Sequence, residues 1–456
     1  MPPIRDWASL APDLVELIGW SVLAGDLQDY VRFRAVCSHW SASTVRPHIR
    51  DPRFHPRRWM MLPEGHGLYP GHRDLRGFVR FLNLSTGAFV RAHLPLLDDH
   101  VILDSVDGLL LLHGDRDTAM RLLHPFTGEI VDLPPLASLL PQMETLRFYN
   151  RSLTMNPYAS VSVSSRGTVT VMLAFTDLDR VAYATDGDQR WTLWEPFTSL
   201  LSSDLSKKSL LSSNGKIYMV EYAYQSHKVH IYRVDPPCTT AADGFPHFPL
   251  LMKISECPLD RFSIIFNLVE CGSETLLVAY NDESCIDLAV YRLADLVIGR
   301  FVPITSIGNY ALVLGERCLC VLLSPNKWLP SVSPNSVICI HNSQSGPNAG
   351  EYVFEQYSLG TGMWTPASDG DIVEMLPPSP HEFTHHIFTC CYRRYWNKGL
   401  MYSGATEPKW LIKQETRFGE YLIIFFLIRD VIIYLNTSYP CQVVDYAIAF
   451  LVTGKS

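Results

Sequence analysis

The chain of 456 residues is 47% hydrophobic and 18% charged, with 31 Pro and 27 Gly. This length fits one large domain plus a smaller one, and the apolar fraction excludes a wholly disordered chain. A formal net charge of -8 excludes binding of polyanions through the charge of the whole chain. The eleven Cys residues do not form the cysteine framework of a small secreted protein, and the N-terminus has no apolar signal core. These features predict reduced thiols and an intracellular location, in the cytoplasm, the nucleus or both.

The chain begins with a helical pattern. Its first apolar stripe has helical spacing: Leu10, Leu14, Leu17 and Ile18. Pro12 and Asp13 suit the first turn of such a helix, because proline costs no hydrogen bond there and an acid complements the helix dipole. Gly19 and Gly25 are the candidates for its end.

A second apolar stripe follows at the same spacing: Tyr30, Phe33, Cys37 and Trp40. Asp26 and Asp29 precede or begin it and are candidate caps. The sequence therefore predicts a bundle of two or three short helices over 5–48, followed by a linker and a first strand over 49–77.

From about Phe78 the hydrophobic period changes from 3.6 toward 2. Runs such as 78–84 and 228–234 alternate between apolar and polar residues, as strands do. Turn-forming triplets that end in Gly lie between apolar runs, which is typical of hairpins: 85–87, 106–108, 126–128, 213–215 and 360–362. The region is predicted to be mostly antiparallel β structure.

The strands also repeat. Residues 81–95, 122–134 and 357–366 share an apolar strand, a Thr-Gly turn, a second strand and a Pro; HIYRVD (230–235) and AVYRLAD (289–295) form a second pair. The first two Thr-Gly pairs are 41 residues apart, which fits one four-stranded propeller blade. About 370 residues at roughly 40–50 per blade would give seven or eight blades, or fewer with long loops. We therefore predict a mainly β fold with a small α module: a kelch-like β-propeller over 78–415, then divergent strands or a tail over 416–456.

The N-terminal segment resembles an F-box. It follows the Leu-Pro start, the apolar helix and the final Val-Cys-x-x-Trp of that family at these positions: Trp7, Leu10, Pro12, Asp13, Leu14, Ile18, Leu23, Asp29, Phe33, Arg34, Val36, Cys37 and Trp40. Ala11 separates Leu10 from Pro12, which are usually adjacent in the family. In that family the helices dock an Skp-type adaptor, which links to a cullin and a ubiquitin-conjugating enzyme. The resemblance implies these adaptor-binding residues: Leu10, Pro12, Leu14, Ile18, Leu23, Phe33, Val36, Cys37 and Trp40.

The remainder, roughly residues 55–415, is similar to the propeller-type domain attached to many plant, especially grass, F-box proteins. These segments carry the similarity: 104–136, 212–220, 302–318, 334–340 and 385–406. Together the two resemblances imply a non-catalytic substrate-recognition subunit of an Skp–cullin–F-box ubiquitin ligase, whose propeller binds a target protein for ubiquitin-dependent degradation. A protein-interaction scaffold that acts through the propeller alone is the alternative, and an enzyme is the third hypothesis.

The apolar stripe of the helices leaves two interpretations open. A partner's groove could bury the stripe, which would supply affinity for an adaptor. Alternatively, Leu10, Leu14, Ile18 and Phe33 pack against the propeller and contact no partner.

No cofactor and no metal site is predicted. One dense group of metal-capable side chains occurs: His381, His385, His386, Cys390 and Cys391. A helix would bring His381 and His385 to one face, as zinc sites require, but 387–389 predicts a strand, which scatters them. The chain has no Gly-x-Ser-x-Gly elbow, and the phosphate-loop-like residues 449–456 leave no room for a helix after their Lys.

Nucleic acid and membrane are not expected as partners. A basic stretch follows the helices: Arg46, His48, Arg50, Arg53, His55, Arg57 and Arg58. Residues 1–60 carry 8 Lys/Arg and 6 Asp/Glu, which leaves 30 and 40 for the rest, so the basic stretch is expected to dock against an acidic propeller. The apolar stretch 421–435 is interrupted by Arg429 and Asp430 and is shorter than the roughly 20 residues of a membrane span; a buried strand pair is predicted there.

Overall fold

A computed structural model gives the structure of the protein and divides it into two compact units, residues 1–412 and 413–456. The described residues belong to the first unit: 7–62, 77–114, 117–143, 153–155, 157–175, 180–194, 209–223, 228–237, 248–258, 265–280, 288–323, 329–342, 351–367, 372–373, 387, 390–391, 400–403 and 409–412. The predicted strand pair at 421–435, the predicted tail and the three clustered histidines lie outside these residues.

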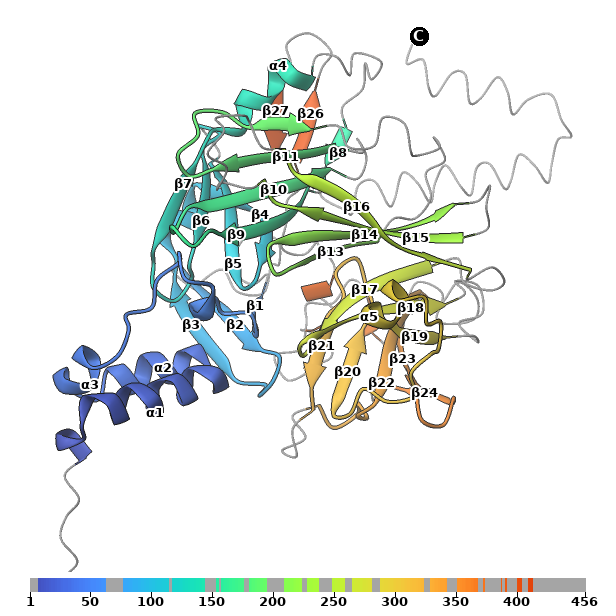
Figure 1. The fold of residues 1–456 in the computed structure, drawn as a ribbon, viewed down its shortest axis with the longest axis horizontal. Helices are drawn as coiled ribbons and strands as arrows, with labels where there is room; N and C mark the ends of the chain where they lie inside the picture. The colour runs from blue at the N-terminus through green and yellow to red at the C-terminus, as the bar shows by residue number, and fades with distance from the viewer. Residues whose placement is uncertain are drawn as a thin grey trace, which may run out of the picture. The chain divides into compact units, whose positions relative to one another are not determined.

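Short helices open the chain, as the N-terminal pattern predicts (Figure 1). They are η1 (Trp7–Ser9), α1 (Pro12–Gly25), α2 (Leu27–Arg34) and α3 (Ser38–Ala42). Pro12 stands in the first turn of α1, and the Asp26 carboxylate caps α2 by accepting hydrogen bonds from its first backbone N–H groups. Gly25 ends α1, whereas the prediction that Gly19 might end it is wrong. A Cβ at Gly19 would lie 3.0 Å from Thr44 Cγ2, so this glycine lets the helices approach closely.

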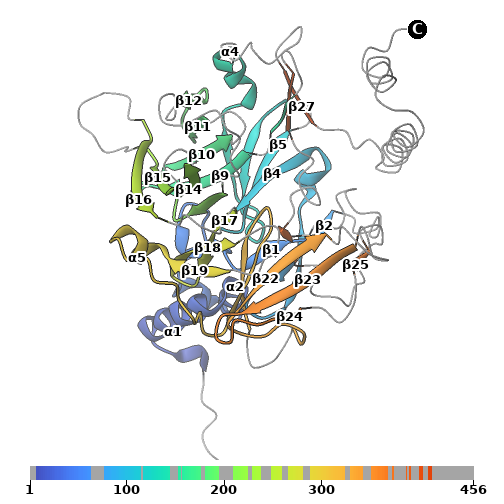
Figure 2. The same ribbon diagram turned by 90° about the vertical axis from the view of Figure 1, so that its right-hand side faces the viewer.

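Six sheets, each made from one continuous stretch of chain, form the blades of a β-propeller in the part of the chain that the structure describes (Figures 1 and 2). Blades 1 to 3 are built from β1 (Trp59–Met61), β2 (Phe78–Asn83), β3 (Phe89–His93); β4 (His100–Val106), β5 (Leu109–Gly114), β6 (Met120–Leu123), β7 (Ile130–Leu133); and β9 (Pro157–Val163), β10 (Val169–Phe175), β11 (Arg180–Thr185), β12 (Thr192–Trp194).

Blades 4 to 6 continue in the same order. Their strands are β13 (Ser209–Ser213), β14 (Lys216–Ala223), β15 (Lys228–Asp235), β16 (Leu250–Cys257); β17 (Ile265–Cys271), β18 (Glu274–Tyr280), β19 (Ala289–Arg292); and β20 (Tyr310–Val313), β21 (Leu319–Leu322), β22 (Ser336–Asn342), β23 (Glu351–Ser358), β24 (Trp364–Pro366), β25 (Ile372–Val373). Pairing is antiparallel except between β20 and β22. The six blades of the described residues agree with the expectation of fewer than seven or eight blades where connections are long, since β1 and β2, and β15 and β16, are separated by long stretches of chain.

The innermost strands contact one another in chain order, from β4 through β9, β13 and β17 to β21. A separate hydrophobic cluster fills each junction between neighbouring blades. Between blades 6 and 1, Leu82 and Leu84 pack with Val313 and Val321, and the Leu322 N–H donates to the Leu84 carbonyl at 3.1 Å. Within the described residues the ring therefore closes by packing and not by a strand shared between the first and last blades.

The three Thr-Gly repeats lie at equivalent points of three blades. They form the β2–β3, β6–β7 and β23–β24 turns, where Gly87, Gly128 and Gly362 have φ of 71°, 72° and 69°. Each glycine N–H donates to a carbonyl four residues earlier, at 2.8 to 2.9 Å. The second pair of repeats likewise begins in the third strands of blades 4 and 5. The repeats predicted from the sequence are therefore confirmed as repeats of structure.

The remaining elements lie between or outside the blades. They are η2 (Pro52–Phe54), η3 (Pro95–Asp98), η4 (Leu136–Leu139), α4 (Leu140–Met143), α5 (Leu293–Val297) and a small sheet of β8 (Leu153–Met155), β26 (Leu400–Ser403) and β27 (Lys409–Ile412). Ile387, Cys390 and Cys391 are helical and buried, so the strand predicted there is wrong. Their side chains pack into the cluster that joins blades 6 and 1, which a single helical face can reach.

Candidate functional site

Asp26 fastens the helices to blade 1, beside which α1 and α2 lie (Figure 1). One carboxylate oxygen caps α2, and the other accepts hydrogen bonds from Trp59 Nε1 at 2.9 Å and Asn83 Nδ2 at 2.7 Å. The Arg58 guanidinium also donates to the Gly25 carbonyl at the end of α1. These polar contacts hold the helices and blade 1 in one arrangement.

An aromatic cluster fills the rest of this junction. Tyr30 and Phe54 are fully buried, with ring centroids 5.6 Å apart, and Trp20 stacks on Phe54 at 6.0 Å. The Arg53 guanidinium lies 4.5 Å from the centroid of the Trp20 ring. Leu23, one of the predicted adaptor-binding residues, packs against this cluster. Of the predicted set, Leu23 is thus placed on the side of the helices that faces the propeller.

The opposite face of α1 is apolar and exposed. Leu14, Leu17 and Ile18 are 47%, 64% and 38% exposed, while Val15 on the inner face is completely buried. Val36 and Trp7 add two more exposed apolar side chains from neighbouring elements of the helical segment. We call Trp7, Leu14, Leu17, Ile18 and Val36 the apolar helix face. The hypothesis that Leu14 and Ile18 pack against the propeller does not agree with this exposure.

Most other predicted adaptor residues support that face from behind. The rings of Phe33 and Trp40 lie 4.4 Å apart, and Trp40 Nε1 donates to the Trp7 carbonyl at 3.1 Å. Cys37 caps α3, its sulfur accepting from the Trp40 N–H at 3.5 Å. Leu10 is half-buried and its carbonyl contacts His39 Nε2 at 2.8 Å, whereas Pro12 is exposed. Sequence reasoning therefore named surface and support residues together and could not separate them.

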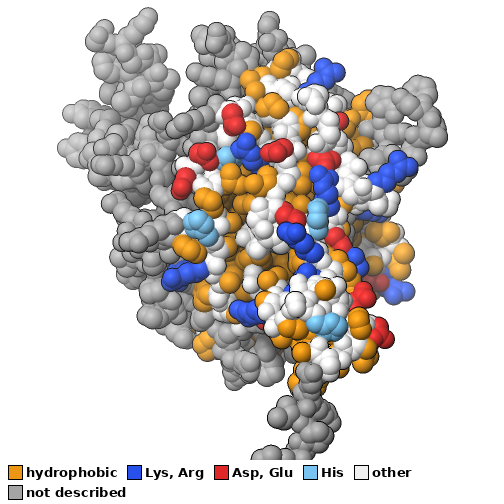
Figure 3. Space-filling view, turned by 90° about the vertical axis from the view of Figure 1, so that its left-hand side faces the viewer, with side chains coloured by type: hydrophobic (Ala, Val, Ile, Leu, Met, Phe, Trp, Pro, Cys, Tyr) orange, Lys and Arg blue, Asp and Glu red, His pale blue; other side chains and the backbone are white. Residues whose placement is uncertain are grey.

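The basic stretch reaches acidic residues of the propeller, as expected. The Arg50 guanidinium pairs with the Asp186 carboxylate and donates to the Gly167 carbonyl in blade 3. Arg57 Nη2 lies 3.4 Å from Asp107 Oδ2 in the β4–β5 turn. On the face of the molecule that carries the helices, Lys and Arg alternate with Asp and Glu and with hydrophobic side chains (Figure 3).

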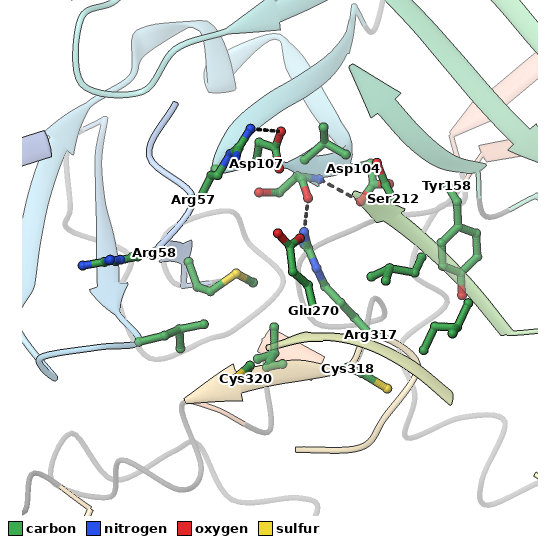
Figure 4. Close-up of a pocket in the computed structure, with 18 of the residues that line it drawn as sticks. Arg57, Arg58, Asp104, Asp107, Tyr158, Ser212, Glu270, Arg317, Cys318 and Cys320 are labelled. Carbon is green, nitrogen blue, oxygen red and sulfur yellow. Dashed lines mark hydrogen bonds and ion pairs between the residues drawn. The ribbon is translucent and has the colours of Figure 1, made fainter. Parts of the chain in front are cut away.

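A cavity of about 410 Å³ lies where the inner strands of the blades converge (Figure 4). Each blade contributes to its lining, including Met60 from blade 1, Tyr158 from blade 3 and Leu211 from blade 4. Charged residues from four different segments also line it: Arg57, Arg58, Asp104, Asp107, Glu270 and Arg317. A cavity that combines apolar walls with a few charged groups is typical of binding sites.

Among the charged residues of this cavity, Glu270 has a carboxyl group with a raised pKa. Burial raises the pKa of its carboxyl group, the nearby Asp107 carboxylate raises it further, and Arg57 and a hydrogen bond with Ser213 oppose both effects. Figure 4 shows the Glu270 carboxyl pointing from β17 into the cavity, toward the residues of β4. Perturbed carboxyl groups inside cavities are concentrated at functional sites.

The thiols that line the cavity are poor nucleophiles. Burial raises the pKa of Cys318 to about 11, and a hydrogen bond with Cys271 together with burial raises the pKa of Cys320. Both thiols therefore stay protonated at neutral pH. Among the described residues no group of three or more His, Cys, Asp or Glu side chains is arranged to hold a metal ion. The helices of the described segments include none that could cross a membrane.

Sequence reasoning did not predict the cavity or the role of Glu270 in it. Glu270 stands in the otherwise largely apolar run IFNLVEC, and Asp104 stands in HVILDSV. A lone acid in such a strand is the signal that could have marked them, because it must either find a partner or line a cavity. Arg317 lies in a turn and carries no comparable signal.

The comparison with protein families agrees with the propeller. The model of the KIB1-4 beta-propeller family matches residues 81–360, more than half of the chain. The Pyrococcus horikoshii acylaminoacyl peptidase has 8% identity and a TM-score of 0.24 over 64% of this chain and 48% of that chain, so this chain spans about half its length. The beta-propeller domain of the Trilobed protease from Pyrococcus furiosus has 10% identity and a TM-score of 0.21 over 64% of this chain and 87% of that chain. No curated protein matches the sequence.

Proposed function

The chain belongs to the KIB1-4 beta-propeller family, and from this premise we propose that it is the substrate-recognition subunit of an Skp–cullin–F-box ubiquitin ligase. In this proposal the apolar helix face docks an Skp-type adaptor, which connects to a cullin, and the propeller binds a target protein. In this proposal the protein acts in the cytoplasm, the nucleus or both, and its N-terminal helices serve as the F-box of a plant F-box protein.

The observation that carries the proposal is the exposure of the apolar helix face. Leu14, Leu17 and Ile18 are adjacent on α1, and none of them belongs to the clusters that hold the helices to the propeller. A contiguous apolar surface rimmed by polar residues is typical of a protein-binding site. Burying three such side chains in a partner's groove would contribute several kcal/mol, at roughly 1.5–3 kcal/mol for each side chain.

The fixed junction between helices and propeller suits this role. A receptor raises the effective concentration of its target near the charged ubiquitin carrier, and it does so best when the two ends keep one geometry. Asp26, Tyr30 and Phe54 supply that fixed geometry. The chain itself transfers no group in this proposal, in keeping with the protonated thiols of its cavity.

A scaffold that acts through the propeller alone is the alternative proposal, and the central cavity is the observation that favours it. The two proposals differ in adaptor binding. A scaffold would bind its partners equally well with and without an intact apolar helix face, and it would not bind an Skp-type adaptor.

Isothermal titration of the purified full chain with an Skp-type adaptor tests the ligase proposal. We expect binding by the parent chain and at least about tenfold weaker binding by Leu14→Asp/Ile18→Asp, because charges replace two buried contacts. The matched control is Val297→Asp/Ile298→Asp, which changes two exposed apolar residues at the end of α5 and should leave affinity unchanged. Circular dichroism checks that all chains fold. Equal affinities of the two variants, or no binding by the folded parent, would reject the proposal.

A further inference from the structure

The central cavity has the size and composition of a ligand site. Its volume of about 410 Å³ falls within the range of roughly 300–1,000 Å³ found for small-ligand pockets. Residues from all six blades line it.

Most of its charges already have partners. The Arg58 guanidinium is directed to the Gly25 carbonyl, away from the cavity, as Figure 4 also shows. Arg317 donates to the Ser105 carbonyl, and Asp104 accepts from the Ala159 N–H at 2.7 Å. Arg58 thereby holds the end of α1, and Arg317 and Asp104 link segments of different blades around the cavity.

The carboxylate of Asp107 is partnered as well. Arg57 Nη2 lies 3.4 Å from Asp107 Oδ2, and His55 Nδ1 lies 3.9 Å from the same oxygen. The Arg57 guanidinium and the His55 imidazole thus both face the Asp107 carboxylate and can balance its negative charge.

Glu270 differs from these residues. It makes no ion pair with any residue that the structure describes; its neighbours are the Asp107 carboxylate, the Arg57 guanidinium beyond ion-pair distance and the Ser213 hydroxyl. A carboxylate removed from water needs either a proton or a cation. Among the described residues, the cation that acts on Glu270 is Arg57, which is already paired with Asp107.

A second orphan lines the same cavity. Ser105 is 3% exposed, and its hydroxyl has no hydrogen-bond partner among the described residues. Buried hydroxyl groups are normally hydrogen-bonded. Leu211, Leu268 and Leu322 form apolar walls beside these polar groups, against which a methylene chain could pack.

We propose that the central cavity binds an organic cation, an alkylammonium or guanidinium group on a short methylene chain, with Glu270 as its counter-ion. The inference does not rest on the ligase function. Two sources carry this chemistry: the side chain of a Lys or Arg on a bound protein, and a free polyamine.

Isothermal titration of the full chain with three probes tests the proposal. The probes are Nα-acetyl-lysine methylamide, its neutral counterpart Nα-acetyl-norleucine methylamide, and spermidine. We expect a cationic probe to bind at least about tenfold tighter than the norleucine probe, since only the cation can form a charged hydrogen bond with the Glu270 carboxylate. Tighter binding of the lysine probe identifies a protein side chain as the source, and tighter binding of spermidine identifies a polyamine.

Glu270→Gln removes the counter-ion while keeping the shape of the side chain, and should weaken cation binding about tenfold or more. Its matched control is Glu274→Gln, because Glu274 begins β18 and pairs with Arg292 outside the cavity, at 3.1 Å. No binding of either cation, or equal binding by parent and Glu270→Gln, would overturn the proposal. The comparison of the lysine and norleucine probes uses the parent chain, so it tests the preference for a cation even if the Gln variant folds poorly.

Discussion

Gly108 shows how a single residue fixes the β4–β5 turn. Its φ is 79°, and an added Cβ would lie 2.1 Å from the Pro56 carbonyl oxygen. Gly108→Ala should therefore lower the free energy of unfolding by about 2 kcal/mol or more, because backbone strain and a clash with main chain add up.

Gly128→Ala is the matched control for this substitution. Gly128 also has a positive φ, 72°, but nothing lies within 4 Å of its added Cβ. Gly128→Ala should therefore lower the free energy of unfolding only by the cost of the positive φ, about 1–2 kcal/mol. Urea unfolding of both variants measures the difference, and equal losses would contradict the account of Gly108.

His113 should make stability depend on pH. It is 2% exposed in β5, its ring nitrogens have no hydrogen-bond partners among the described residues, and burial lowers its pKa from 6.5 to about 4. The unfolded chain therefore binds a proton on this histidine at a higher pH than the folded chain does. The free energy of unfolding should fall as pH drops from about 6.5 to about 4, by an amount on the order of 3 kcal/mol.

The variant His113→Leu cannot take up this proton. Between pH 7 and pH 4.5 it should lose about 2 kcal/mol less stability than the parent, as measured by urea unfolding at both pH values. The buried His124, whose pKa burial also lowers, is present in both chains and cancels from the comparison. Equal losses in parent and variant would show that His113 does not titrate in this way.

At the level of elements, Asp26 couples the start of α2 to blade 1. Asp26→Ala removes a helix cap, which is worth about 0.5–2 kcal/mol, and leaves Trp59 Nε1 and Asn83 Nδ2 without this acceptor. We expect amide hydrogens of residues 12–42 to exchange faster while those of blades 3 and 4 are unchanged, as measured by mass spectrometry.

Asp29→Ala serves as the control for the helix segment. Asp29 is exposed and pairs with Arg32 three residues along α2, an interaction worth about 0.2–0.5 kcal/mol. If the amide hydrogens of residues 12–42 exchange as slowly in Asp26→Ala as in Asp29→Ala, the role proposed for Asp26 is wrong.

Elements with strong local signals could be predicted from the sequence. Pro12 and the acidic cap Asp26 marked the helix starts, and the Thr-Gly turns marked hairpins that recur in three blades. The interpretation of Gly19 as a helix end was wrong, because a glycine is needed where helices pack closely as well as where a helix ends. The strand expected at 387–389 was wrong because the burial of a helical face there depends on tertiary contacts.

The site could be predicted only in part, for a related physical reason. Leu14 and Ile18 follow from helical periodicity together with the F-box resemblance, and the structure exposes them. Leu23 was named from the F-box resemblance alone. It lies nine residues after Leu14, on the opposite side of a helix with 3.6 residues per turn, and it faces the propeller. Glu270 and Asp107 come from blades 5 and 2, and no local pattern predicts that they share one cavity.

At the scale of the described unit, the propeller is a ring of blades held by packed junctions, with the helices attached to blade 1. Each junction has its own hydrophobic cluster, so stability is spread around the ring. The apolar helix face lies outside all of these clusters and remains available to a partner. In the proposed function the helices serve assembly and the propeller serves recognition.

Ubiquitin transfer onto the chain itself tests this assignment most directly, because it needs no knowledge of the target. The full chain would be mixed with an Skp-type adaptor, a cullin complex, a charged ubiquitin carrier and ATP, and modified lysines would be counted by mass spectrometry. A docked receptor holds its own lysines at high effective concentration near the carrier. We predict modification of the parent and of Val297→Asp/Ile298→Asp, and little modification of Leu14→Asp/Ile18→Asp. Equal modification of all three folded chains, or none of the parent, would contradict the account.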